Sequence, residues 1–566
     1  MNAKMFFKLF ICVIASSLFI GCNKADVEVL APLQVQSSDV FTLNATYGAD
    51  GTRVAFDDDG LGLTWQPGDC LYLVDVSGTN STVTLVTHIA EPSKTAAFRS
   101  TSSVLSGDYV VVYGHNNIKI DKSISMRPAD MISSEVMMCG SLSVVDGQTS
   151  ASITLSHVFT MLTFKFANLP VLSSMRLGMA VTEDGMIEAG KGEIDGKGYL
   201  SGSYTKFNEF GWNDGEEARS LIFPMDLSGK TVYFYVQGLD ASGGYVTYEF
   251  VKSGKELCAG VNYNLIFDFA QASSVCTIKK NARSHYILSA PAQFRAAAYL
   301  DNRDYCYSVE EDVDFTGEAY FPLIARCLYG NGHTLSNISV DLSECSYVGV
   351  VSSGAVEDLK VKNSSFVGAD YVGGIAGYSY DPIIQCGFEG DVNGCEYVGG
   401  ILGYGLDRQY KGYLVEKSYV KGNVDGTEYV GGVAGFASCR NSYHIGDATG
   451  SDYVGGISGD GDYSYNCYSY GTVSSGYGIA PYVFLYNGYY DRNLTSSSYM
   501  CEDYSDGNCN CGPDKTFLSK LSVINSDEAY STQVWKDIDA QCPLLQWQAD
   551  ALGGDVEVPG FGDEDW

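Results

Sequence analysis

Tyr371-Val372-Gly373-Gly374-Ile375-Ala376-Gly377 is the stretch that decides the fold, because the chain repeats it three more times. The copies read YVGGILG at 397–403, YVGGVAG at 429–435 and YVGGISG at 453–459. A unit of about 25 residues, built from short β-branched segments and glycines, cannot bury its own apolar face and has to stack on the next unit. The repeats therefore predict a parallel β-helix in which the valine and the isoleucine or valine of each copy form ladders inside the stack.

Degenerate copies extend the series on both sides, beginning at Tyr347 and at Tyr477. Counted from Tyr347, the tyrosines are 24, 26, 32, 24 and 24 residues apart. The glycines are expected at corners where the backbone φ is positive, which glycine adopts at little steric cost. The 32-residue interval predicts an insertion that leaves the stack as a loop.

The four copies resemble the GLUG repeat of bacterial surface and secreted proteins. The preceding stretch Gly330-Asn331-Gly332-His333-Thr334-Leu335 is similar to the coil that commonly comes before such repeats. This resemblance implies a right-handed parallel β-helix over residues 283–500. Residues 501–566 are then a C-terminal cap and acidic tail, since a solenoid needs closed ends.

The region before the repeats alternates apolar and polar residues with a period of two. Phe41, Leu43, Ala45 and Tyr47 share one face of one expected strand, and Leu162, Phe164 and Phe166 share a face of another. This patterning, interrupted by Gly, Ser, Asn and Asp, is typical of antiparallel strands with one buried face. We therefore expect an all-β protein with two tandem β-sandwiches, at residues 39–151 and 152–272, before the repeats.

Two stretches of this region, Leu63–Asp69 and Ser156–Phe164, resemble segments of fimbrillin-type pilus and accessory lipoproteins. The resemblance implies fimbrillin-like domains. Pilus subunits of that family polymerise by donating a strand to a neighbour. The repeats that follow the sandwiches here favour an accessory, tip or free-standing surface role instead.

The first 21 residues have two lysines and an apolar run, which is the pattern of a secretion signal. Gly21 directly precedes Cys22, and this end resembles a bacterial lipobox in which Cys22 becomes the acylated first residue. Residues 22–38 would then be a tether, and acyl chains would anchor the protein in the outer membrane. Lys24 with nearby acidic residues resembles an export signal of surface lipoproteins, so we expect outward display.

The composition limits the partners. The formal net charge is -33, which repels nucleic-acid phosphates, so we expect no nucleic-acid partner. After Cys12 and Cys22, the remaining 15 of the 17 cysteines are scattered. Only Cys501, Cys509 and Cys511 cluster, and they lack the fourth ligand of a zinc site. Disulfides or small buried thiols are the expected roles.

The insertion is the first candidate site. Arg408, Tyr410, Lys411 and Tyr413 place two cations and two aromatic rings in a loop of an acidic protein. Such a loop suits contact with a glycan or a protein. The alternative is a tolerated, solvated insertion without a ligand.

An acidic column is the second candidate. Asp370, Glu396, Glu428 and Asp452 each precede a repeat tyrosine. Like charges at the spacing of neighbouring strands repel, so these side chains either point into solvent or share a divalent cation such as calcium. Apart from this weak metal candidate, we expect neither a metal nor a cofactor.

We assign no catalytic residue. Asp447, Asp460 and Asp462 are the carboxylates that a polysaccharide-cleaving site would have to use, but turn formation explains them as well. We therefore expect a surface lipoprotein that is not an enzyme, with the sandwiches as a stalk and the β-helix as an adhesive or ligand-binding module. The expected partners are a host or microbial glycan or surface protein. The alternatives are a carbohydrate-active β-helix enzyme, a lyase or hydrolase, and a fimbrial accessory or tip subunit that partners fimbrial subunits.

Overall fold

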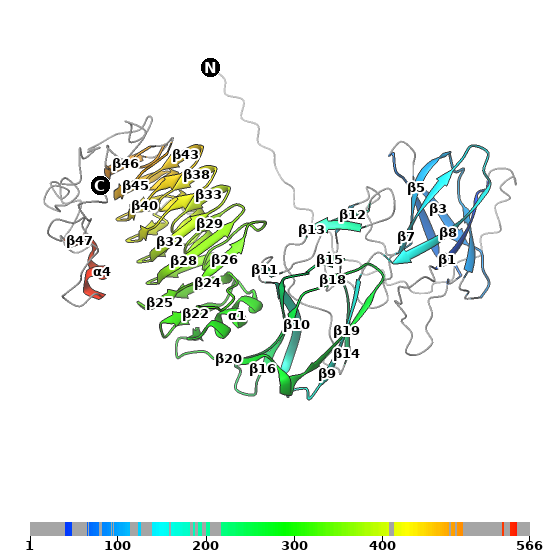
Figure 1. The fold of residues 1–566 in the computed structure, drawn as a ribbon, viewed down its shortest axis with the longest axis horizontal. Helices are drawn as coiled ribbons and strands as arrows, with labels where there is room; N and C mark the ends of the chain where they lie inside the picture. Colours follow the sequence, from blue (N-terminus) through cyan, green and yellow to red (C-terminus); the bar gives the residue numbers. More distant parts are fainter. Residues whose placement is uncertain are drawn as a thin grey trace, which may run out of the picture.

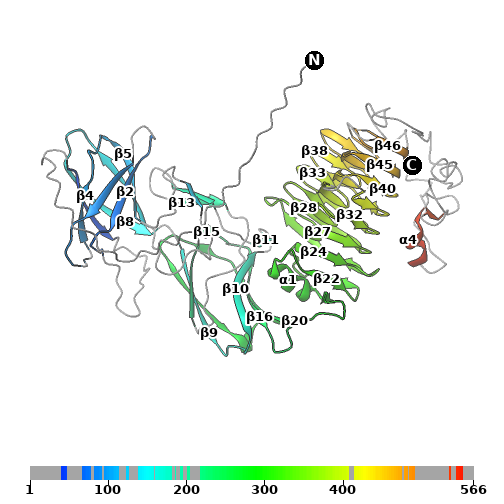
Figure 2. The same cartoon turned by 180° about the vertical axis from the view of Figure 1, so that it is seen from behind.

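The structure is a computed structural model that describes most of the chain between Val40 and Ala551. The described residues are 40–47, 65, 67–77, 82–91, 93, 95–113, 123–125, 138–157, 160–181, 185–186, 191–194, 200–203, 217–222, 224–406, 413–474, 477–481, 484–490, 535–536 and 544–551. Nearly all regular structure in them is β. A barrel, a two-sheet sandwich and a long stack of parallel strands follow one another along the chain (Figures 1 and 2). No helix in these ranges is both long and apolar enough to cross a membrane.

The first part is a closed seven-stranded barrel rather than the expected two-sheet sandwich. Its strands are β1 (Thr42–Tyr47), β2 (Cys70–Asp75), β3 (Val83–Thr87), β4 (Thr95–Ser100), β5 (Gly107–Tyr113), β7 (Met138–Val144) and β8 (Ser150–His157). The order is β1-β4-β3-β2-β5-β7-β8, and β1 closes the sheet by pairing in parallel with β8. Trp65, which is fully buried, contacts the rings of Phe98 and Tyr113 inside the barrel.

The second part is a sandwich, as expected. Its strands are β9 (Thr160–Ala167), β10 (Ser173–Val181), β11 (Gly185–Met186), β14 (Glu217–Ile222), β15 (Met225–Asp226), β16 (Thr231–Leu239), β17 (Tyr245–Ser253), β18 (Glu256–Leu257), β19 (Asn262–Asp268) and β20 (Ser274–Ile278), followed after β19 by the 3-10 helix η2 (Phe269–Gln271). Sheets β11-β10-β16-β17-β20 and β14-β9-β19 enclose a core rich in phenylalanine. A small separate sheet joins β6 (Ser123–Ser125), β12 (Lys191–Ile194) and β13 (Leu200–Ser203).

Helix α1 (Pro291–Leu300) joins the sandwich to the repeats without a break in the core. Tyr235 of β16 stacks on Tyr299 of α1 with ring centroids 3.9 Å apart. Arg295 of α1 donates two hydrogen bonds to the buried carboxylate of Glu249 on β17, both at 3.0 Å. Because a buried charge pair is costly to break, this contact fixes the sandwich against the first coil.

The third part, which we call the repeat stack, consists of parallel strands from β21 to β46. Its 22-stranded sheet contains β21 (Tyr286–Leu288), β22 (Cys306–Val309), β23 (Val313–Asp314), β24 (Leu323–Tyr329), β25 (Thr334–Ser336), β26 (Ser339–Leu342), β27 (Val351–Glu357), β28 (Lys360–Gly368), β30 (Ala376–Ser379), β31 (Ile383–Ile384), β32 (Gly387–Asn393), β34 (Leu402–Gly405), β35 (Val415–Glu416), β36 (Tyr419–Lys421), β37 (Val424–Asp425), β39 (Ala434–Phe436), β40 (Cys439–Arg440), β41 (Tyr443–Ile445), β42 (Ala448–Thr449), β44 (Ser458–Asp460), β45 (Tyr463–Tyr470) and β46 (Phe484–Tyr490). A second sheet has the four short strands β29 (Val372–Gly373), β33 (Glu396–Gly399), β38 (Glu428–Gly431) and β43 (Asp452–Gly455).

The repeats pair in the register that the sequence predicts. Val372 pairs with Val398, Val398 with Val430, and Val430 with Val454, and all four side chains are fully buried. The isoleucine or valine three residues further along each copy is also fully buried and hydrogen-bonded to its equivalent. The predicted aliphatic ladders are therefore confirmed.

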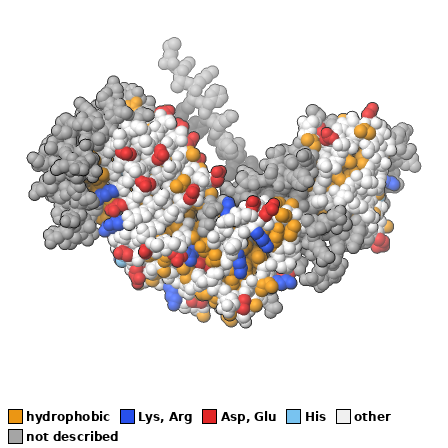
Figure 3. All heavy atoms as spheres, viewed as in Figure 1, with side chains coloured by type: hydrophobic (Ala, Val, Ile, Leu, Met, Phe, Trp, Pro, Cys, Tyr) orange, Lys and Arg blue, Asp and Glu red, His pale blue; other side chains and the backbone are white. Residues whose placement is uncertain are grey.

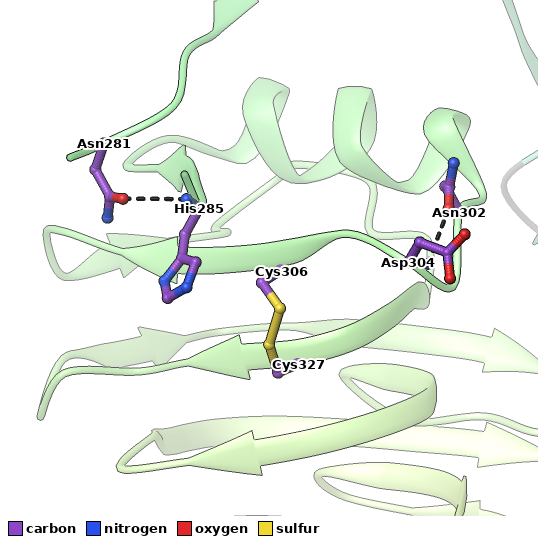
Figure 4. The surroundings of a disulfide bond; sticks show 6 residues. All are labelled: Asn281, His285, Asn302, Asp304, Cys306 and Cys327. Atoms are coloured by element: carbon purple, nitrogen blue, oxygen red, sulfur yellow. Dashed lines mark hydrogen bonds between the residues drawn. A yellow bond between two sulfur atoms is a disulfide. The ribbon is translucent and has the colours of Figure 1, made fainter. Parts of the chain in front are cut away.

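A disulfide joins two neighbouring coils near the start of the stack. Cys306 of β22 and Cys327 of β24 are direct partners in the parallel register and form a bond with a Cα–Cα distance of 4.7 Å (Figure 4). Two of the scattered cysteines therefore form a disulfide, which is one of the two roles expected from the sequence. Cys386, Cys439 and Cys467 are buried free thiols within the stack.

The last degenerate copy lies in a different register from the expected one. Tyr477 pairs with Gly455, and Ile457 donates its backbone N–H to the carbonyl of Ile479. Tyr477 thus occupies the position of the first repeat glycine, two residues away from the tyrosine position. This shift places Ile479 beside Ile457, so Ile479 joins the buried ladder.

The repeat glycines are required for close packing rather than for positive φ. A Cβ atom on Gly432 would collide with the imidazole of His444 and the carbonyl oxygen of Gly456. Gly432 has no positive φ, and the left-handed residue is instead the repeat tyrosine, with φ of 55° at Tyr429. The expectation of glycine corners is therefore wrong for these glycines.

The C-terminal segment lies against the side of the stack. It contains β47 (Trp535–Lys536), β48 (Leu544–Leu545) and α4 (Gln546–Ala551). Tyr419, Tyr443 and Tyr468 stack on one another in successive coils. Trp547 contacts Tyr419, and Trp535 contacts the other two. The segment therefore covers one tyrosine ladder of the stack.

Candidate functional site

A second tyrosine ladder runs along the short sheet β29-β33-β38-β43 and begins one coil before it. Its members are the repeat tyrosines Tyr347, Tyr371, Tyr397, Tyr429 and Tyr453. Successive rings are stacked with centroids 4.5–5.1 Å apart and planes within 11° of parallel. The alignment follows directly from the parallel register, which places each residue beside its equivalent in the next coil.

A second aromatic column lies beside the first. Tyr378, Tyr404 and Phe436 directly follow the first three full repeats and pair in register. Tyr404 lies edge-on to Tyr397, with centroids 5.1 Å apart and planes at 89°. The two columns therefore form a herringbone, which we call the aromatic strip: Tyr347, Tyr371, Tyr397, Tyr429, Tyr453, Tyr378, Tyr404 and Phe436. The strip faces solvent in part, and the Tyr347 residue is 46% exposed.

The backbone at each tyrosine of the first column is left-handed. Their φ values run from 67° at Tyr347 to 50° at Tyr453. This conformation costs an ordinary L-residue about 1–2 kcal/mol, and glycine or asparagine adopts it more readily. Ring stacking returns about 0.5–1.5 kcal/mol per pair. An interior ring such as Tyr397 contacts four other rings, so the ring contacts within the strip offset the cost of the left-handed backbone.

The hydroxyl groups of Tyr371, Tyr397, Tyr404 and Tyr429 have raised pKa values and stay protonated at neutral pH. Burial, followed by the neighbouring tyrosines and the Glu396 carboxylate, raises the pKa of Tyr397 to about 12. Burial likewise raises the pKa values of Tyr371, Tyr404 and Tyr429. The strip therefore offers O–H donors together with aromatic rings.

The predicted acidic column lies directly beside the strip. Glu396 pairs with Glu428, and Glu428 with Asp452, in the parallel register. The backbone N–H of Tyr347 donates to the carbonyl of Asp370, which places Asp370 in the same column. Glu396 and Asp452 are exposed and the other two are half-buried. Within the described ranges, no three His, Cys, Asp or Glu side chains gather as a metal site would require.

Carboxylates are spread over the visible face of the stack rather than gathered in one patch (Figure 3). Of the three considered for catalysis, Asp460 pairs with Phe436 and so lies at the end of the second aromatic column. Burial, and then the Asp462 carboxylate, raises the pKa of Asp460. Asp447 lies in another column, where it accepts hydrogen bonds from the backbone N–H and hydroxyl of Thr472.

The insertion is only partly described. Arg408, Tyr410 and Lys411 lie outside the described residues, as does the lipidation residue Cys22. Tyr413 is half-buried and packs inside the protein: its ring contacts that of Tyr465, and the Arg440 guanidinium lies 5.5 Å from its centroid. Tyr413 is therefore already engaged in a contact within the stack.

The strip was missed as a site, although the sequence contains its signal. Each full repeat begins with tyrosine, and the residue after the seventh position is Tyr378, Tyr404 or Phe436 in three of the four copies. Positions that keep an aromatic residue, although they are not in the aliphatic core, mark a column on the surface of a solenoid.

No family model matches the chain. It is 34% identical over 124 residues to halomucin of Haloquadratum walsbyi; the match covers 21% of this chain and 1% of that protein's length. It is similar to the crystal structure of a candidate immunoglobulin A1 protease from Bacteroides ovatus (TM-score 0.38, 18% identity, 47% of this chain and 94% of that one). It is also similar to a candidate cell adhesion protein from Bacteroides uniformis (TM-score 0.29, 14% identity, 42% and 97%).

Proposed function

We propose that this protein is an outer-membrane lipoprotein, displayed outward, whose repeat stack is a non-enzymatic adhesion or ligand-binding module. The stack would be a right-handed parallel β-helix of GLUG-type repeats, and the barrel and sandwich would be its fimbrillin-like stalk. The observation that carries the proposal is the aromatic strip. It spans five successive coils, is partly open to solvent and keeps tyrosine where the backbone conformation disfavours it. Exposed aromatic rows are suited to ligand contact.

The lipid anchor is tested at Cys22, the thiol that the signal places at its end. Cys22→Ala should remove acylation and release the protein in soluble form after secretion. Palmitate labelling and membrane fractionation measure this, with Cys258→Ser as a control because Cys258 is an exposed thiol of the sandwich. Recovery of the Cys22 variant in the outer membrane at the wild-type level would contradict the anchor.

The binding function is tested by probing glycan and surface-protein arrays with the full chain. We expect a ligand whose binding falls when the strip is altered by Tyr371→Asn with Tyr397→Asn. The insertion is the competing site, and Arg408→Ser, Tyr410→Ser and Lys411→Ser together test it on the same array. Loss of binding only in the insertion variant would move the site to the loop. Co-purification with fimbriae would favour the accessory or tip role.

A carbohydrate-active enzyme remains the second candidate because Asp460 has a raised pKa and lies beside Asp462. A carboxyl group with a raised pKa is suited to general acid catalysis. Polysaccharide cleavage by the wild type, lost in Asp460→Asn and retained in Asp425→Asn, would establish this function. We expect no polysaccharide cleavage by the wild type or by either variant.

A further inference from the structure

We propose that the aromatic strip and the acidic column bind lysine- and arginine-rich protein segments as a single surface. This inference rests on the proposed binding function of the repeat stack and specifies its ligand. The two features alternate by necessity, because each carboxylate residue directly precedes a tyrosine of the strip. A ligand that contacts one tyrosine therefore comes close to a carboxylate.

The chemistry of this combination favours cations. The π-face of an aromatic ring attracts ammonium and guanidinium groups, and a carboxylate accepts charge-assisted hydrogen bonds from the same groups. A neutral ligand would use the rings and leave the carboxylates without a function. An anionic ligand would be repelled by the column and by the net charge of -33. Charge complementarity thus selects a basic partner.

The chain itself shows how tyrosine columns of this stack accept cations. On other columns, the Arg440 guanidinium lies 5.5 Å from the Tyr413 ring and 5.7 Å from the Tyr465 ring. Lys421 lies 5.7 Å from the ring of Tyr419. These contacts lie within the distance at which cation–π attraction operates. The strip presents rings of the same kind, in register and beside carboxylates.

The spacing of the surface determines its selectivity. Coils follow one another at about 4.8 Å, whereas side chains on one face of an extended peptide recur at roughly 6.6–6.8 Å. The ligand and the strip therefore cannot match residue by residue, and long flexible basic side chains have to adapt. Binding should depend on the density of positive charge more than on sequence. Arginine should be preferred to lysine because its planar group stacks on rings and pairs bidentately with carboxylates.

The test uses the full chain and three fluorescent probes: an octa-arginine peptide, an octalysine peptide and the neutral glycan cellohexaose. We expect octa-arginine to bind more tightly than octalysine, and cellohexaose not to bind. Glu396→Gln with Glu428→Gln should weaken octa-arginine binding at least fivefold and reduce its salt dependence. Tyr371→Asn with Tyr397→Asn should also weaken it at least fivefold, and asparagine tolerates the left-handed backbone.

The matched control is Glu311→Gln with Glu357→Gln, which removes two exposed charges elsewhere on the stack. It should change octa-arginine affinity less than twofold. Equal weakening by the control would overturn the proposal, because attraction would then come from net charge alone. Melting temperatures check folding. If the double tyrosine variant unfolds, Tyr347→Asn at the exposed end of the strip replaces it and should weaken binding at least twofold.

Two outcomes separate this inference from the proposed function. Cellohexaose binding that is lost in the tyrosine variant but kept in the carboxylate variant would identify a neutral glycan site, so the ligand class would be wrong and the adhesive role would stand. A chain that binds neither peptide but binds an array ligand would likewise show that the ligand class is wrong and that the adhesive role stands. A chain that binds no probe and no array ligand would remove both.

Discussion

Tyr397 and Tyr429 stack with ring centroids 4.7 Å apart and planes at 7°, although the insertion lies between them in the sequence. The 32-residue coil thus presents its tyrosine in the same place as coils of 24 and 26 residues. The extra residues fall in the sequence between β34 and β35, and both strands stay in register with their neighbours β30 and β31. The surface of the strip is therefore independent of the length of individual coils.

The left-handed backbone at the repeat tyrosines predicts an unusual order of stability. Tyr397→Ala removes the ring contacts and keeps the steric cost of a Cβ at positive φ, whereas Tyr397→Gly removes both. We expect the glycine variant to be more stable than the alanine variant by about 1 kcal/mol, with both below the wild type. Thermal and urea unfolding measure the order. An alanine variant more stable than the glycine variant would contradict the left-handed assignment.

The close packing at Gly432 predicts a large loss of stability in Gly432→Val. The new side chain would collide with His444 and with the next coil at Gly456. We expect a loss of more than about 2 kcal/mol, since overpacking and strain add together. Thr427→Val is the control because Thr427 is exposed in the same coil, and it should shift stability by less than about 0.5 kcal/mol. An unchanged melting temperature in Gly432→Val would rule out tight stacking of the coils there.

The raised pKa of Asp460 predicts a pH-dependent gain from Asp460→Asn. A carboxyl group whose pKa is higher in the folded than in the unfolded chain binds its proton more tightly when folded. The native state therefore loses stability as pH rises above the ordinary value of 3.8, and the loss is complete at neutral pH. Asp460→Asn should melt at a higher temperature than the wild type at pH 7. The difference should vanish below about pH 3.8, and Asp425→Asn, at an exposed position, should show no such pattern.

The disulfide between Cys306 and Cys327 closes a loop with a sequence separation of 21 residues. A loop of this length predicts a contribution of about 3 kcal/mol to stability. Reduction with dithiothreitol should lower the melting temperature of the wild type and leave that of Cys306→Ser with Cys327→Ser unchanged. Cys258→Ser should respond to reduction as the wild type does. Equal sensitivity of the double variant would show that the effect of the reductant lies elsewhere.

The acidic column predicts little response to calcium. Glu396 and Asp452 are exposed, so their side chains can point into water. Millimolar calcium should then change the melting temperature no more than sodium at equal ionic strength, because screening alone acts. A calcium-specific rise that disappears in Glu396→Gln with Glu428→Gln would instead make the column a cation site with shared carboxylate oxygens.

The interior of the stack could be predicted from sequence because the spacing of the repeats determines which residues pair between coils. Val372 and its equivalents recur at each copy, and a parallel stack has to place equivalent residues side by side. The register of Tyr477 follows the apolar position and not the tyrosine. Ile479 comes two residues after Tyr477, whereas Ile457 comes four residues after Tyr453, so aligning the isoleucines gives the observed register and aligning the tyrosines does not.

Features that depend on distant segments were out of reach of the sequence. The parallel pairing of β1 with β8 that closes the barrel joins residues more than a hundred positions apart, such as Thr42 and Ser150. The buried pair of Glu249 and Arg295 likewise joins a sandwich strand to a helix of the repeat stack. Alternation identifies such strands but says nothing about their partners. For the site, the sequence predicts the acidic column, whereas the repeat tyrosines in the sequence indicate the period of the stack and not that their rings reach its surface.

The parallel register has a consequence for how this protein can change over generations. Every coil pairs with the coil before it and with the coil after it through equivalent residues. Removing or duplicating one whole coil between Tyr371 and Tyr429 would therefore bring together two coils whose strands already pair in register. The junction at α1 would not have to adapt, whereas the C-terminal segment, whose Trp547 contacts Tyr419, would have to shift along its tyrosine ladder. Recombination between repeats would then change the reach of the molecule in steps of about 4.8 Å and lengthen or shorten its row of tyrosines in proportion. The inherited number of coils thus sets both the length of the molecule and the number of tyrosines that it presents to a ligand.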